Sequence, residues 1–143
     1  MADLQASCIL QPGDPIFGRV TLAKKTAATN IQKGDFVKLT TGEIEVVSGA
    51  TDDATFLGVC SMKSEDADGP TNLLIYTQCI VECPMESAAY AFGAGLKYNT
   101  NGTLEADGSA NTIAFAWETK GTTTSLKVLV DVIALGKLFT VSA

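Results

Sequence analysis

The residue types that carry most enzyme chemistry are scarce in this chain. Its 143 residues include no histidine, which excludes a Ser-His-Asp or Cys-His relay, a histidine general base and a histidine-ligated zinc or iron site within the chain. Catalysis would have to rely on carboxylates, lysine or a bare thiol. Two adjacent carboxylates, Asp52 and Asp53, tend to point apart in a strand or turn, so a glycosidase-like pair would need a partner from elsewhere. The sequence therefore predicts no catalytic residue and no enzyme.

Two loops have the composition of a ligand site but not its spacing. The acidic residues 64–70 include alternating carboxylates, which suit calcium, but the third acidic position and the closing glutamate of a helix-loop-helix calcium site are missing. Gly93 and Gly95 resemble the start of a dinucleotide-binding loop, but Tyr98 stands at the third glycine position and a strand pattern follows instead of a helix. We predict two turns, with no metal and no cofactor.

The four cysteines are predicted to be reduced. The segment that begins at Met1 lacks the basic start and apolar block of a secretory signal, so we expect synthesis in the cytoplasm, where thiols stay reduced. Cys79 and Cys83 are four residues apart. In an extended strand, at about 3.3 Å per residue, their Cα atoms would be about 13 Å apart, too far for a disulfide. We interpret all four, Cys8 and Cys60 included, as small apolar residues, with a metal or redox role as the alternative.

Charge and hydropathy restrict the partners. Ten Lys and Arg against sixteen Asp and Glu leave a net charge of −6, whereas wrapping a phosphate backbone needs clustered cations. No apolar run approaches the length of a membrane span. A chain of this length fits one domain, which would bury about 68–70% of the surface of its unfolded state. We expect a single domain that binds neither nucleic acid nor membrane.

The chain repeats itself imperfectly. Residues 37–45 (VKLTTGEIE) are echoed by residues 96–105 (LKYNTNGTLE), with one residue inserted in the turn. In each copy a glycine precedes this segment, and a strand-like run and a longer apolar strand follow it. In the first copy these are Gly34, residues 55–59 and residues 73–76. In the second copy they are Gly95, residues 113–117 and residues 126–130. Units of roughly sixty residues are too small to bury a core alone, so they are predicted to merge into one small β-barrel or sandwich.

Local patterns place the strands of these two units, which cover about residues 34–81 and 93–135. Each echoed segment predicts a hairpin, the first through Thr40-Thr41-Gly42 and the second through Asn101-Gly102. Residues 73–81 and 126–135 read as long apolar strands. Residues 85–92, after Pro84 and before Gly93, are the one stretch with a helical pattern, with a bent loop as the alternative. The prediction is an all-β domain over residues 18–143 with at most one short helix.

Residues 1–17 are predicted to form an extended N-terminal arm. Pro12-Gly13 and Asp14-Pro15 break any regular element, yet the arm holds apolar side chains that are unfavourable in water. Two interpretations remain open: a strand that lies along the domain, or an arm that docks on another subunit or protein. The apolar residues are Leu4, Ile9, Leu10, Ile16 and Phe17.

The order of several short segments resembles a known family. The segments are Gly34-Asp35-Phe36-Val37, Leu57-Gly58-Val59-Cys60, residues 91–99 and the strand 126–130. In this order they are similar to the head decoration proteins, or capsid cement proteins, of tailed bacteriophages, in which such segments recur twice in a small β-barrel. The second copy departs from that pattern at Ala116-Trp117, where the family has glycine and valine, and the arm matches nothing in it.

The resemblance implies a structural virion protein. Such proteins bind the outer face of a closed shell, often as trimers, and stabilise it. By this resemblance the partners are the major capsid protein and two further copies of the chain, and the location is the outer capsid surface. The arm has no counterpart in the family, and its five apolar residues are the candidate capsid contacts because their apolar area suits a partner surface. Two other classes stay open: a secreted or cell-surface carbohydrate-binding or adhesion module, and a carboxylate-dependent enzyme.

Overall fold

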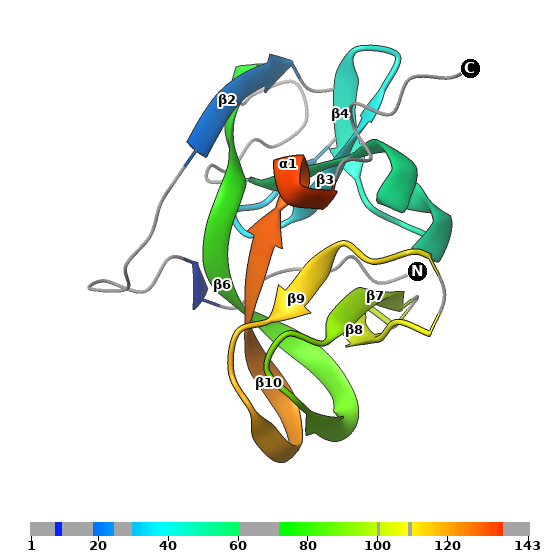
Figure 1. The fold of residues 1–143 in the computed structure, drawn as a ribbon. Helices are drawn as coiled ribbons and strands as arrows, with labels where there is room; N and C mark the ends of the chain where they lie inside the picture. The colour runs from blue at the N-terminus through cyan, green and yellow to red at the C-terminus, as the bar shows by residue number, and fades with distance from the viewer. Residues whose placement is uncertain are drawn as a thin grey trace.

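A computed structural model describes residues 8–9, 19–24, 30–60, 72–99, 101–108 and 110–135. In this part of the chain ten strands belong to one sheet, accompanied by a 3-10 helix and a four-residue α-helix (Figure 1). The strands are β1 (Cys8–Ile9), β2 (Arg19–Lys24), β3 (Phe36–Thr40), β4 (Glu43–Val46), β5 (Phe56–Cys60), β6 (Asn72–Tyr90), β7 (Gly95–Asn99), β8 (Thr103–Ala106), β9 (Ala114–Ala116) and β10 (Lys120–Asp131), and the helices are η1 (Ala50–Thr55) and α1 (Val132–Leu135). The all-β class is confirmed.

Five strands close into a barrel. The sheet runs in the order β10, β9, β7, β8 and β6, and an additional pairing of β10 with β6 joins its ends. One parallel bridge, between Met85 of β6 and Leu104 of β8, completes the ring. Closure removes exposed strand edges, which would otherwise invite pairing with other chains. The predicted small β-barrel is therefore present.

Both predicted hairpins are confirmed. In the first, Thr40 pairs with Glu43, and the turn takes a positive φ at Thr41 (50°) and Gly42 (83°). In the second, Asn99 pairs with Thr103 and Gly102 has a φ of 80°. Glycine adopts such a backbone without the steric cost of a Cβ atom, which explains why each turn carries one.

The two units share one pairing scheme. β3 pairs with β4 and β5, and β5 pairs with β6, while β7 pairs with β8 and β9, and β9 pairs with β10. Tyr76 of β6 and Leu129 of β10 are equivalent positions, because each pairs with the same point of its unit's third strand. Two residues beyond them stand Gln78 and Asp131, which pair with each other as β6 and β10 run antiparallel. An approximate twofold axis therefore passes between Gln78 and Asp131.

The helix predicted over residues 85–92 is wrong, because most of these residues belong to a strand. The chain up to Tyr90 continues as part of β6, because its backbone pairs with β10: Pro84 lies opposite Ser125, and Ala88 opposite Thr123. This pairing is remote in sequence and overrides the local helical pattern. The register shifts twice along it, which bends the strand pair.

The strand predicted over residues 126–135 ends early, at Asp131. The Asp131 carboxylate accepts a hydrogen bond from the Ala134 N–H at 3.1 Å, which favours a helical turn over further strand. A carboxylate in this position caps the first turn of a helix, so α1 follows directly. The sequence did not predict this helix, and its four residues are the α-helix of the described residues.

The N-terminal part of the chain supplies two further strands to β6. β2 pairs with β6 from Asn72 to Gln78, the residue at which β10 also ends its pairing. β1 pairs with Glu82 and Val81, which on their other edge pair with β10. β6 is therefore the central strand of the molecule, with which β1, β2, β5, β8 and β10 all pair (Figure 1).

Only part of the arm lies in the described residues. Ile9 belongs to β1, so the backbone at this point follows the domain. Leu4, Leu10, Ile16 and Phe17 lie outside the described residues, as does the acidic loop 64–70.

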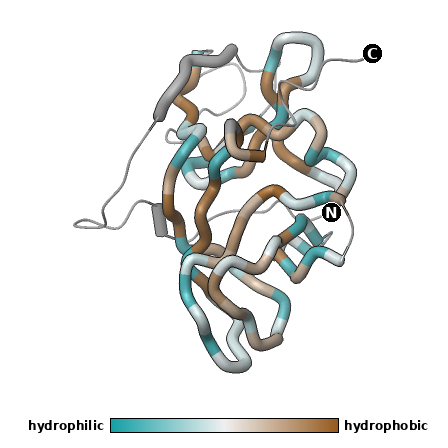
Figure 2. The backbone as a smooth tube through the Cα atoms, in the orientation of Figure 1, coloured by the Kyte–Doolittle hydropathy of each residue, from teal (hydrophilic) through white to brown (hydrophobic). Residues whose placement is uncertain are grey.

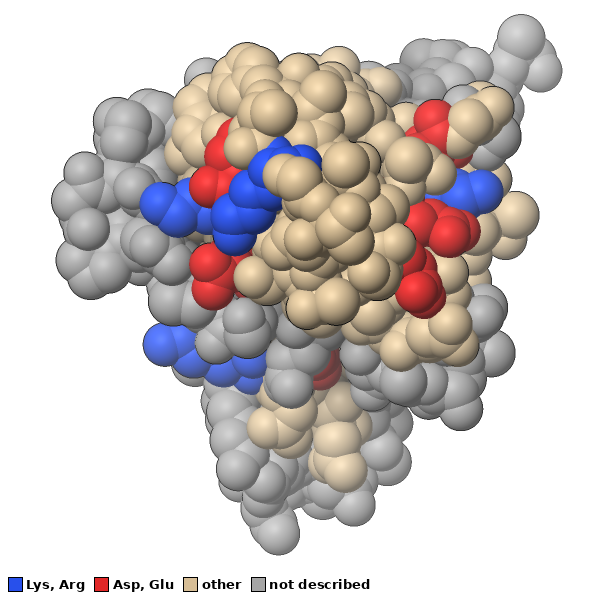
Figure 3. Space-filling model, turned by 90° about the horizontal axis from the view of Figure 1, so that it is seen from below, with Lys and Arg blue, Asp and Glu red and all other residues tan. Residues whose placement is uncertain are grey.

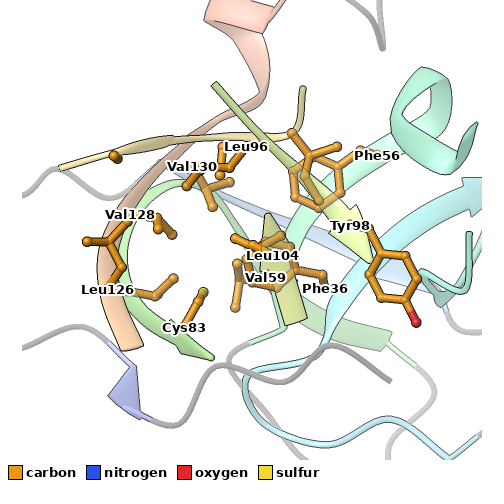
Figure 4. Close-up of a cluster of buried hydrophobic side chains, with 14 of the residues drawn as sticks. Phe36, Phe56, Val59, Cys83, Leu96, Tyr98, Leu104, Leu126, Val128 and Val130 are labelled. Carbon is orange, nitrogen blue, oxygen red and sulfur yellow. The ribbon is translucent and has the colours of Figure 1, made fainter. Parts of the chain in front are cut away.

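Two hydrophobic clusters fill the molecule. The larger one fills the barrel, where side chains from several strands point toward one another (Figure 4). Its members include Phe36, Phe56, Val59, Cys83, Leu96, Tyr98, Leu104, Leu126, Val128 and Val130. The smaller cluster belongs to the first unit and comprises Ile31, Val37, Ile44, Leu57, Cys60, Leu73 and Ile75. Figure 2 shows the hydrophobic stretches along the central strands. Each fully buried side chain of this kind stabilises the fold by about 1.5–3 kcal/mol.

Candidate docking surface

The carboxylate Asp52 has a structural role. It accepts hydrogen bonds from the Ser48 and Gly49 N–H groups at 2.8 and 3.0 Å and forms an ion pair with Lys38 at 3.0 Å. Burial acts to raise the pKa of Asp52, but these hydrogen bonds and the lysine charge outweigh it and hold the pKa below its ordinary value. The ionised carboxylate thereby ties the start of η1 to β3, which accounts for its presence without catalysis.

The thiols Cys60, Cys79 and Cys83 are buried. Burial raises the pKa of Cys79 to about 12. It also raises the pKa of Cys83, to which the nearby Cys79 and Glu82 charges add. A thiol is a nucleophile and a metal ligand only as the thiolate, so Cys79 and Cys83 are chemically quiet at neutral pH. Cys60, Cys79 and Cys83 pack in the core as small apolar residues, as the sequence predicts, whereas the Cys8 side chain lies outside what the structure describes.

The glycines Gly93 and Gly95 shape a turn between strands. Gly93 has a φ of 88°, and its N–H donates to the Ala116 carbonyl at 2.8 Å. A Cβ atom on Gly95 would lie 2.9 Å from Thr112 Oγ1, so that position needs its lack of a side chain. The segment leads into β7, as predicted, and therefore offers no helix N-terminus to an anion.

A cluster of polar side chains links the β7–β8 hairpin to β6. Glu86 Oε1 accepts hydrogen bonds from Asn101 Nδ2 at 3.0 Å and from Thr103 Oγ1 at 3.1 Å. The Tyr90 hydroxyl donates to the Glu86 carbonyl at 2.6 Å. Burial raises the pKa of Tyr90, and the charges of Glu86 and Glu105 raise it further, so the hydroxyl stays protonated. These groups support the rim of the barrel.

Neither a metal cluster nor a membrane helix is found within the described ranges. No three carboxylates or thiols come together there as ligands would. No helix in the same part of the chain is both long and apolar enough to cross a membrane. The remaining candidate is a surface.

We call this surface the barrel tip and define it as residues 87–93 and 117–124, where the end of β6 lies beside the start of β10. Phe92 stands out, because 60% of its surface is exposed and it is the exposed large hydrophobic side chain of the described residues. The residues just before it in the chain, Ser87, Ala88, Ala89 and Ala91, are exposed as well. Figure 3 views the molecule from this end and shows a broad uncharged area with charged side chains on either side of it.

Phe92 is held in place. Its ring packs against that of Trp117, with centroids 5.3 Å apart and a tilt of 45°. Its N–H donates to Thr119 Oγ1 at 3.0 Å. The sequence prediction missed this site because residues 85–92 read as a helix, which would have spread these side chains around an axis. The available signal was an apolar run that ends at a turn glycine, Gly93.

The comparisons with known proteins concern the fold. No family model matches the chain, and no curated protein matches it. Among solved structures it is similar to the crystal structure of the head fiber gp8.5 N base in bacteriophage phi29, with a TM-score of 0.52 and 15% sequence identity. The match covers 81% of this chain and 96% of that one. The chain therefore shares the all-β fold of a phage head fiber base, and at this identity the likeness concerns the fold alone.

Proposed function

We propose that the chain is a structural protein of a tailed-phage head that attaches to the outer surface of the capsid and stabilises the shell. The observation that carries the proposal is the fold likeness, which extends over 96% of the base of a phage head fiber. The decoration-protein resemblance of the sequence points in the same direction from independent features, namely short segments in a fixed order. The partner is then the major capsid protein, and the location is the virion surface.

The chemistry of the described residues supports a role in binding rather than in catalysis. Asp52 and Glu86 are occupied in holding turns and hairpins, and Cys79 and Cys83 are protonated in the core. A decoration protein acts as a clamp. Its binding free energy to neighbouring capsid subunits must be overcome before the shell opens. Association as a homotrimer would add avidity without new contacts.

A reconstitution experiment tests this function. Heads of the phage that encodes the chain are prepared without it, mixed with the purified protein and sedimented. We expect saturable co-sedimentation, ordered density on the outer surface in electron micrographs, and release of packaged DNA at a higher temperature. Heads of an unrelated phage are the control. Absence of binding to the cognate heads, with the protein folded, would refute the proposal.

A further inference from the structure

The barrel tip differs from the rest of the molecule in charge. The chain carries a net charge of −6, yet residues 87–93 contain no charged side chain. The charges of residues 117–124 are Glu118 and Lys120, which form an ion pair at 3.3 Å. Glu118 Oε1 also accepts the Lys127 N–H at 3.1 Å, so this carboxylate is neutralised and held at the margin. When such a surface is buried against another protein, no unpaired charge has to lose its water. Burying most other parts of an acidic molecule would require that desolvation.

Burying the exposed residues of the barrel tip costs little conformational entropy. Ala88, Ala89 and Ala91 lose no rotamer freedom when a partner covers them. Ala88 and Ala89 end β6 on opposite faces of the strand and Ala91 follows it, so their small side chains leave the backbone there accessible. Small exposed residues that precede one large aromatic residue in the chain suit a protein interface in which one anchor fills a pocket and neutral contacts exclude water.

Phe92 is such an anchor because it is already positioned. Trp117 supports its ring from one side, and the bond to Thr119 Oγ1 fixes its backbone. The adjacent bond from the Gly93 N–H to the Ala116 carbonyl fixes the turn itself. A side chain that is ordered before binding loses less entropy on association than a mobile one, so more of its burial contributes to affinity.

We propose that the barrel tip docks on an uncharged protein surface with an apolar pocket that receives the Phe92 ring, and that this surface is the outer face of the assembled capsid. The identity of the occupant rests on the proposed function; the location of the docking face rests on the charge, exposure and order of the tip. In this orientation the β3–β4 hairpin, at the other end of the molecule, points away from the shell (Figure 1).

Two substitutions test the tip and one serves as the control. Phe92→Ser removes the anchor, and Ala88→Glu places a charge and bulk on the small-residue area. Thr40→Glu adds the same charge at an exposed position of the first hairpin, far from the tip. Thermal unfolding of each variant is measured first, because all three positions are exposed or near the surface and should unfold close to the original protein.

Binding to the cognate heads is then titrated. We expect Phe92→Ser and Ala88→Glu each to weaken binding by about tenfold or more, the range of interface anchors, and Thr40→Glu to bind as the original protein does. If the original protein binds the heads and both tip variants bind equally well, the docking face is wrong while the proposed function stands. If the original protein does not bind heads, the function fails, and the inference fails with it. Phe92-dependent binding to a bacterial surface glycan, without binding to heads, would also overturn it in favour of an adhesion module.

Discussion

The two units of the chain follow one pairing scheme, but they complete their structures differently. The second unit is closed into a barrel by β6, which extends past Gln78 and carries Met85 to its bridge with Leu104. The first unit lacks the corresponding extension of β10, which ends at Asp131 where α1 begins. β2 pairs with β6 there instead. Similar hairpins therefore do not imply similar assembly: the extension of β6 closes the second unit into a barrel, and the first unit depends on a segment from the N-terminal side.

The largest expected effect comes from removing that segment. Deleting residues 2–24 removes β2 and its pairing with β6, so we expect the first unit to open. Amide hydrogen exchange should then become fast in β3 and β4 while β7 and β9 stay protected, because their partners remain. Equal loss of protection in both units would contradict the contrast between them.

A shorter deletion is the matched control. Removing residues 2–12 deletes β1 and leaves β2, so the melting temperature should stay nearly unchanged.

The same truncation tests the arm residues Leu4, Ile9 and Leu10 as capsid contacts. If they bind the shell, attachment to heads should weaken greatly. A truncated protein that unfolds several degrees earlier and still decorates heads would assign the arm to the domain instead.

The next effect distinguishes equivalent positions in the third strand of each unit. Gly58 has a φ of 146°, and a Cβ atom there would lie 2.2 Å from the Tyr76 carbonyl oxygen. Gly58→Ala should therefore destabilise the fold by about 3 kcal/mol or more, or prevent folding, as measured by denaturant unfolding. The equivalent residue of the second unit is Ala114, and Ala114→Gly should cost about 1 kcal/mol through backbone entropy. Comparable losses at the two sites would show that the units do not differ there.

A smaller effect is expected at the junction of the units. Asp131 accepts hydrogen bonds from Gln78 Nε2 at 2.9 Å and from the Ala134 N–H at 3.1 Å. Asp131→Ala removes both and should cost about 1–2 kcal/mol, the usual range for a lost helix cap and hydrogen bond. Gln78→Ala removes only the first and should cost less. An equal loss for the two variants would mean that the cap on α1 contributes nothing.

The smallest effect is a pH dependence confined to the first unit. The folded-state pKa of Asp52 is lowered, so its contribution to stability is present above the ordinary carboxyl pKa and is lost as the pH falls through the folded-state value. Asp52→Asn should lower the melting temperature at neutral pH, and the difference from the original protein should disappear in strong acid. A difference that persists there would rule out ionisation as its source.

Sequence reasoning succeeded where structure is set locally. The two hairpins follow from turn residues such as Gly42 and Gly102, and the all-β class follows from the strand patterns around them. It failed over residues 85–92, whose conformation depends on β10, more than thirty positions away in the chain at Ser125. The tip could not be seen for the same reason, since Phe92 meets Trp117 only after β9 and β10 are in place. The pairing of β2 with β6 is likewise remote, and no local pattern specifies it.

The bond between Gln78 and Asp131 has an implication for the origin of the chain. Equivalent residues that face each other across a twofold axis are the mark of an isologous interface, the kind formed by two identical subunits. A half-length ancestor could form the same antiparallel contact with a second copy of itself. Duplication and fusion of its gene would then turn an association that depends on concentration into one that does not, and would free each half to diverge, one toward a closed barrel and the other toward accepting a strand from the N-terminus.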